Sequence, residues 1–177
     1  IGSGYWIGKE VLLKLSFNES IINHDPDLLQ LKNIVFEKFE SNNLNEALQN
    51  IVDDEDSLSL KASLAKDVIN ISEDNEIALS ILQEATFNVA DYIVDLYSML
   101  DYQKTDDLVL FGNGSVIKSP IYRKSINDSL SFQFKNISWI FSDISAAYGS
   151  AIIAAISKDK VLINVKDIIK GDYLASS

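Results

Sequence analysis

Residues 107–119 read DLVLFGNGSVIKS, and this stretch decides the fold that we expect. Residues 107–111 form a short, almost wholly apolar run, which is typical of a strand buried on both faces in a parallel sheet. The run ends at Gly112-Asn113-Gly114, where the two glycines permit positive φ angles and a close approach of the backbone to a ligand. A segment of helical period, residues 121–130, follows the turn.

A strand, a glycine turn and a helix start in this order allow two interpretations. Backbone N–H groups in such a turn, together with a helix N-terminus, can hold phosphate or the polar edge of a nucleotide. Two glycines also occur in tight turns that bind nothing, so a simple connection between strand and helix fits these residues equally well. The stretch by itself leaves both interpretations open.

The length and composition of the chain predict a single globular domain. Its 177 residues, 47% hydrophobic and 23% charged, suffice for one core. The absence of cysteine excludes disulfides, thiolate metal sites and cysteine-ligated iron–sulfur clusters, and no apolar run is long enough to span a bilayer, so we expect a cytoplasmic protein. A net charge of −11 argues against nucleic acid and anionic membranes as partners.

The spacing of apolar residues predicts a helical first half. We expect helices over residues 5–15, 26–39, 44–52, 57–71 and 75–100. The second of these has a clear start, because Asp25 can cap it and Pro26 suits its first turn. The last carries a long stripe of apolar residues spaced by threes and fours, which predicts a buried face: Ile77, Ile81, Ala85, Val89, Tyr92, Leu96 and Met99.

The second half of the chain predicts strands alternating with helices. Residues 138–141 read as a second short strand, 145–156 as a helix of very small residues, and 161–170 as a short strand or turn and a last helix. Two strands joined by a helix normally lie parallel with a right-handed crossover. Because two strands rarely form a stable sheet alone, we expect further strands from residues before Ile1 or from a partner chain.

Four segments, taken in order, resemble one family. They are GSGYWIGKEVL from Gly2, ASLAKDV at residues 62–68, LVLFGNGSVIKSPIY at 108–122 and SAAYGSAIIA at 145–154. They are similar to the C-terminal lobe of N-acetylglucosamine kinase-like sugar kinases, a family that includes archaeal broad-specificity hexokinases and BadF/BadG-type ATPases within the actin-like ATPase superfamily. The resemblance implies an α/β fold: a helix-rich C-terminal lobe of ribonuclease-H-like type, with a small parallel sheet completed by residues outside this chain.

The resemblance also implies which residues bind the ligands, namely ATP with Mg²⁺ and a sugar. For the nucleotide it implies the family's adenosine motif, its continuation and the start of the small-residue helix: Gly112, Gly114, Ser115, Lys118, Ser119 and Gly149. For the sugar it implies Gly2, Ser3 and Gly4, which match the end of an acidic-Gly-Ser motif.

The chain departs from the family at its first residue. Members usually carry an acidic residue immediately before the first glycine, where this chain has Ile1. The family's phosphate-binding loops and its catalytic aspartate belong upstream of Ile1, so the resemblance assigns no catalytic residue and no metal ligand to this chain. The single histidine, His24, lies in a connector and is expected at the surface.

The resemblance therefore implies ATP-dependent phosphorylation of a sugar or amino sugar, with this chain supplying the lobe that positions the nucleotide. One alternative is a non-catalytic nucleotide-binding module of the same fold, which Ile1 favours. Another is a kinase for an acidic sugar such as 2-keto-3-deoxygluconate. The related ATPase that activates 2-hydroxyacyl-CoA dehydratases holds an iron–sulfur cluster by cysteines, which this chain lacks. Relatives often dimerise, so a homodimer is compatible with the resemblance.

Overall fold

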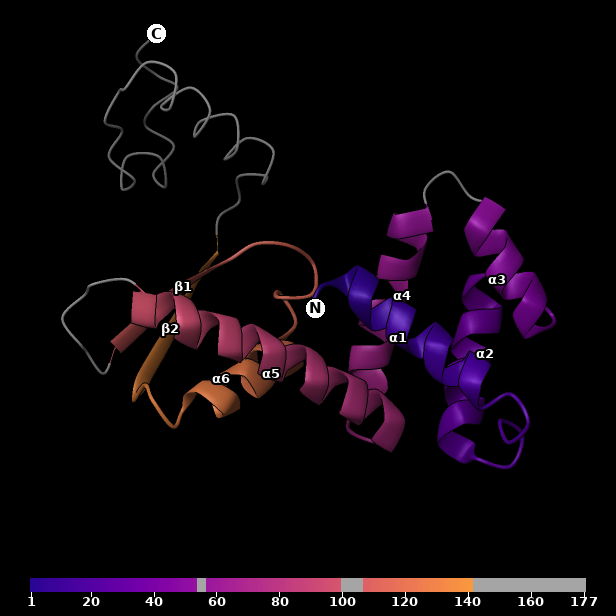
Figure 1. The fold of residues 1–177 in the computed structure, drawn as a ribbon, viewed down its shortest axis with the longest axis horizontal. Coiled ribbons are helices and arrows are strands. Elements are labelled where there is room, and N and C mark those ends of the chain that lie inside the picture. The colour runs from indigo at the N-terminus through magenta and orange to yellow at the C-terminus, as the bar shows by residue number, and fades with distance from the viewer. Residues whose placement is uncertain (54–56, 100–106, 142–177) are drawn as a thin grey trace, which may run out of the picture. The chain divides into compact units, whose positions relative to one another are not determined.

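The computed structural model of the chain describes residues 1–53, 57–99 and 107–141 (Figure 1). The helix expected over 145–156, the tail at 161–170 and Gly149 lie outside the described residues. Contacts along the chain divide it into two compact units. The first unit comprises residues 1–108 and 115–137, and the second comprises residues 109–114 and 138–177.

The first half is helical, as the sequence predicts. Its helices are α1 (Gly4–Phe17), α2 (Pro26–Lys38), α3 (Leu44–Asp53), α4 (Ser57–Ile71) and α5 (Glu76–Met99). The predicted start of α2 is confirmed: the Asp25 carboxylate accepts hydrogen bonds from the N–H groups of Asp27 and Leu28, at 2.9 and 3.1 Å. Ser3 caps α1 in the same way, because its hydroxyl accepts from the Trp6 N–H at 3.2 Å.

The predicted strand–helix–strand order is also confirmed. Strand β1 (Asp107–Gly112) leads through the glycine turn to α6 (Pro120–Leu130), and β2 (Asn136–Phe141) follows. The two strands pair in a small parallel sheet, which gives the described part of the chain a mixed α/β character. Ser119 caps α6, and Pro120 occupies its first turn.

The core of the first unit forms where α1 packs against α4 and α5 packs against α6 (Figure 1). Apolar side chains from one face of each helix fill it, among them Ile7, Leu15, Leu64, Ile81 and Ile126. Each of these five is at most 1% exposed. Burial of this kind is the main stabilising contribution to such a bundle of helices.

Strand β1 is not buried on both faces, contrary to the expectation from its apolar sequence. Leu108 is buried, whereas Val109 and Phe111 are 53% and 61% exposed. The side chains of a strand alternate between two faces, so Val109 and Phe111 share one face of β1, and that face is exposed. The sheet has only two strands among the described residues.

The apolar stripe of α5 is likewise buried over only part of its length. Ile81 and Ala85 are buried, but Tyr92, Leu96 and Met99 are 58%, 60% and 81% exposed. Periodicity predicts which residues share a face of a helix, but not how far a neighbouring element extends along that face. The fully buried positions of α5 end at Ala90.

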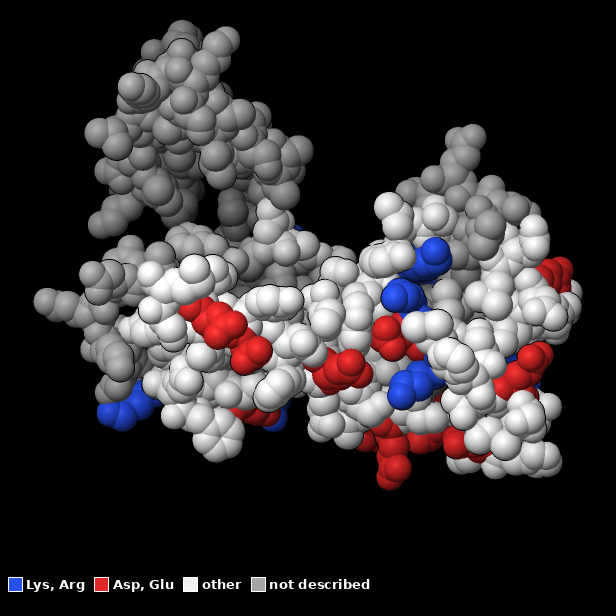
Figure 2. Space-filling model, in the orientation of Figure 1, with Lys and Arg blue, Asp and Glu red and all other residues white. Residues whose placement is uncertain are grey.

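Charged side chains are dispersed on the face of the molecule that Figure 2 shows. Acidic and basic residues are both spread over its described part, and the basic ones do not form one continuous area. None of the described helices combines the length and the apolar character needed to cross a bilayer.

Candidate functional site

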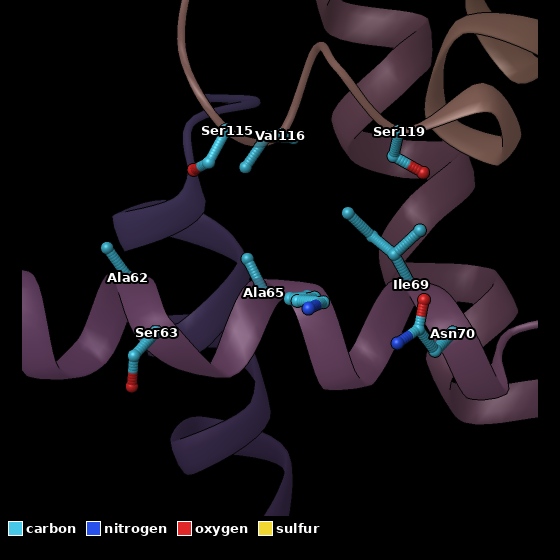
Figure 3. Close-up of a pocket in the computed structure, with 9 residues that line it drawn as sticks. Ala62, Ser63, Ala65, Ile69, Asn70, Ser115, Val116 and Ser119 are labelled. Carbon is cyan, nitrogen blue, oxygen red and sulfur yellow. The ribbon is translucent and has the colours of Figure 1, made fainter.

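A pocket of about 260 Å³ lies in the first unit, between α4 and the segment that follows Gly114 (Figure 3). Helix α4 and that segment both contribute to its lining, which consists of Ala62, Ser63, Ala65, Lys66, Ile69, Asn70, Ser115, Val116 and Ser119.

Helix α4 forms the floor of the pocket with small side chains. Ala62, Ala65 and Ile69 are spaced by three and four residues, so they share one face of the helix and point toward the opposite segment (Figure 3). Ser63 points away from that segment. Because two of the three floor residues are alanines, the helix leaves room above its surface that larger side chains would fill.

The opposite wall is a segment held in place by its own helix. Arg123 donates hydrogen bonds from Nη1 to the carbonyl oxygens of Ile117 and Lys118, at 2.9 and 2.7 Å. The Ser119 N–H also donates to the Val116 carbonyl at 3.0 Å, which closes a turn. These contacts fix the backbone that presents Ser115, Val116 and Ser119 to the pocket.

The N-terminal segment, residues 2–4, adjoins this pocket. A Cβ atom placed on Gly4 would lie 3.2 Å from the Ala62 carbonyl oxygen and 3.2 Å from Val116 Cγ2, and both of these residues line the pocket. Glycine at this position thus allows α1 to begin close to both walls. The start of α1 therefore lies against both walls of the pocket.

Gly2 is held by a buried hydrogen bond. It has a φ of +86°, and its carbonyl accepts from the Tyr122 hydroxyl at 2.6 Å. A Cβ on Gly2 would overlap Val89 and lie 3.2 Å from both the Ala85 carbonyl oxygen and Tyr122 Oη. Burial raises the pKa of Tyr122 to about 12, so its hydroxyl remains protonated and donates this bond at neutral pH.

The structure brings several predicted site residues together. Ser115 and Ser119, predicted for the nucleotide, line the pocket, and the predicted sugar residues Gly2, Ser3 and Gly4 form the segment beside it.

The remaining predicted nucleotide residues do not line the pocket. Gly112 packs against Phe141, whose Cε1 would lie 2.5 Å from an added Cβ. Gly114 has the positive φ that its turn predicts, +103°, with open space around it. Lys118 is exposed and contributes its carbonyl to the bond with Arg123. Gly149 lies outside the described residues.

Several residues of the site were not predicted as site residues. Ala62, Ala65 and Lys66 belong to a segment that carries the resemblance. Two alanines three positions apart also indicate a helix face that carries only small side chains. Tyr122 also ends a segment that carries the resemblance, but no sequence signal marks the hydrogen bonds that Tyr122 and Arg123 form. Their partners are backbone carbonyls, which a sequence does not distinguish from one another.

The pocket offers apolar walls with a few polar groups. The methyl groups of α4 and Val116 suit a flat apolar ring, and the hydroxyls of Ser115 and Ser119 can hydrogen-bond its polar edge. The Lys66 ammonium forms no ion pair with any carboxylate in the described part of the chain, so it is free to attract an anionic ligand. No group of three acidic or histidine side chains among the described residues could hold a metal ion.

No protein-family model and no curated protein sequence matches the chain. The function proposed below therefore rests on the geometry of the pocket and on the resemblance of the segments that form it.

Proposed function

We propose that this chain is the nucleotide-positioning lobe, of ribonuclease-H-like type, of an ATP-dependent kinase that phosphorylates a sugar or amino sugar. One observation carries the proposal: three of the four segments with the family resemblance meet at the pocket. They are residues 2–12, residues 62–68 and residues 108–122. Nothing in the sequence alone requires these three segments to be neighbours in the fold.

The pocket is suited to the nucleoside part of ATP. With about 260 Å³ it is smaller than most sites for whole drug-sized ligands, so it would hold the adenosine and leave the phosphates outside. The apolar faces of Ala62, Ala65 and Val116 would pack on the base, and Ser115 and Ser119 would bond its edge or the ribose. Lys66 would favour the anionic phosphates by charge.

The segment of Gly2, Ser3 and Gly4 is placed to receive the sugar. Phosphoryl transfer depends on holding donor and acceptor at the right distance and on stabilising the charge of the transferred group. This segment adjoins the pocket through Gly4, so a sugar bound there would lie near the nucleotide. Mg²⁺ bound to the phosphates would neutralise their charge, and we assign it no ligand among the described residues.

The first test fills the pocket. In the Ala62→Leu variant the larger side chain would occupy the space above α4, and we expect the affinity for ADP and ATP to fall by about tenfold or more, the effect of losing roughly 1.4 kcal/mol of binding free energy. Isothermal titration calorimetry on the intact protein measures it. The matched control is Ser59→Leu, which adds the same side chain to an exposed position of α4 that does not line the pocket.

Unchanged nucleotide affinity in Ala62→Leu would reject this pocket as the nucleotide site. A coupled assay of ADP release then separates the two functions that share the pocket. The assay uses Mg²⁺–ATP with glucose, N-acetylglucosamine, mannose or 2-keto-3-deoxygluconate as acceptor. Turnover with one acceptor supports the kinase and names its substrate. Saturable ATP binding without turnover supports the non-catalytic module that Ile1 favours.

A further inference from the structure

We propose that Tyr122 is a positioning residue, whose hydroxyl fixes the segment of Gly2, Ser3 and Gly4 relative to the nucleotide pocket. The inference rests on the proposed function, because it assigns a purpose to the sugar-binding segment named there. Its starting point is the hydrogen bond of 2.6 Å from Tyr122 to the Gly2 carbonyl, which joins residues 120 positions apart.

Gly2 occupies a closely fitting slot. Ala85 and Val89 of α5 and Tyr122 of α6 surround its Cα so tightly that no side chain fits there. The slot restricts where Gly2 lies, and the Tyr122 hydroxyl determines how its peptide is turned, because it is the donor to this buried carbonyl. Turning of this peptide would also move Ser3, whose hydroxyl and carbonyl accept from Trp6 and Ile7 at the start of α1.

Tyr122 is also tied to the pocket through its own helix. It lies three positions after Ser119, which lines the pocket and caps α6. The N-terminal segment returns to the same pocket at Gly4, beside Ala62 and Val116. Contacts therefore form a closed ring that runs through Ser119, Tyr122, Gly2, Gly4 and Val116. This ring fixes the position of the start of α1 relative to the pocket wall.

The test removes only the hydroxyl, in the Tyr122→Phe variant of the intact protein, with Tyr92→Phe as the matched control. Tyr92 is 58% exposed on α5, so removal of its hydroxyl leaves no buried acceptor without a donor. Native-state hydrogen exchange is the first readout. We expect the amides of Trp6 and Ile7, which donate to Ser3, to exchange about tenfold faster in Tyr122→Phe, because a net hydrogen bond of this kind accounts for about that factor. Amides within α2 should not change.

Steady-state kinetics is the second readout. We expect the KM for the sugar to rise by about tenfold in Tyr122→Phe, with the KM for ATP within about twofold of wild type. A role in overall stability alone would raise both KM values together, and would speed exchange equally throughout α5 and α6. Either of those results, or exchange at Trp6 and Ile7 equal to that of the Tyr92→Phe control, would overturn the inference.

The two proposals fail in different ways. If the wild-type protein neither binds ATP nor turns over any sugar, the proposed function is wrong. The exchange comparison still decides the role of Tyr122, because it requires no ligand. If ATP binding and turnover are normal in the wild type but Tyr122→Phe behaves as Tyr92→Phe does, the function stands and the positioning role is wrong.

Discussion

A single glycine determines how closely α1 packs against α4. Gly8 lies where the two helices cross, and a Cβ at this position would overlap the backbone carbonyl of Lys61. The neighbour is main chain, which cannot rotate away as a flexible side chain would. The position therefore requires glycine, although glycine in a helix interior ordinarily costs about 0.5–1 kcal/mol relative to alanine.

The Gly8→Ala variant tests this contact. Its helix propensity is better, yet we expect the free energy of unfolding to fall by about 1–3 kcal/mol because the helices must move apart. Chemical denaturation followed by circular dichroism measures it. Ser16→Ala, at an exposed position of the same helix, serves as the control and should stay within about 0.5 kcal/mol of wild type. A stabilised Gly8→Ala variant would show that the crossing tolerates a methyl group.

For single residues, the sequence predicts hydrogen-bond partners that are close along the chain but not those that are distant. Asp25 and Pro26 predicted the start of α2 because a cap and its N–H partners are at most three residues apart. The pairing of Tyr122 with Gly2 spans 120 positions, and the same tyrosine would have read as an ordinary core residue of α6. Its role becomes visible only when the fold places the two residues together.

The junction between α2 and α5 depends on one buried amide. Asn75 is 1% exposed, and its Nδ2 donates to the Asp27 carbonyl and to Gln30 Oε1, at 3.0 and 2.9 Å. Its Oδ1 accepts from the Ala78 N–H at 2.8 Å, as a helix cap does. Asp27 completes the junction, because its carboxylate accepts from the Glu76 N–H at 2.9 Å.

Replacement of Asn75 by alanine should separate these helix ends. We expect Asn75→Ala to lower the free energy of unfolding by about 2 kcal/mol, because a cap is lost and a backbone carbonyl is left without its buried donor. Thermal and urea unfolding measure the change. Asn88→Ala is the control, since the Asn88 amide donates to a carbonyl of its own helix at an exposed site. An equal effect of both substitutions would contradict the role of the junction.

The sequence predicts the bounds of the helices and strands better than it predicts which of their residues are buried. Helix bounds followed from spacing and from caps, which are properties of neighbouring residues. The burial of β1 and of the second half of α5 did not follow, because it depends on which layer lies against each face. Phe111 and Leu96 are apolar and exposed, and nothing in their local sequence distinguishes them from Leu108 or Ile81, which are buried.

On the scale of the whole molecule, the first unit has a core of its own. The buried apolar side chains among the described residues all lie between Ile7 and Phe134 and all belong to this unit. The residues that line the pocket fall within 62–70 and 115–119, and they also belong to this unit. The candidate site could be predicted in part, because its loop has a glycine signature, whereas its floor on α4 required the packing of helices distant in sequence.

A chain shortened to residues 1–141 tests whether the core of the first unit forms without residues 142–177. It keeps α1–α6 and both strands, so we expect it to unfold in one cooperative transition, with a Tm within about 2–4 °C of that of the chain of residues 1–177, the shift that about 1 kcal/mol produces in a domain of this size. Far-ultraviolet circular dichroism, which reports helix content, follows the transition. Broad, non-cooperative melting would mean that residues 142–177 are required for the core. If the shortened chain melts normally, its affinity for ADP then measures the contribution that the resemblance assigns to Gly149.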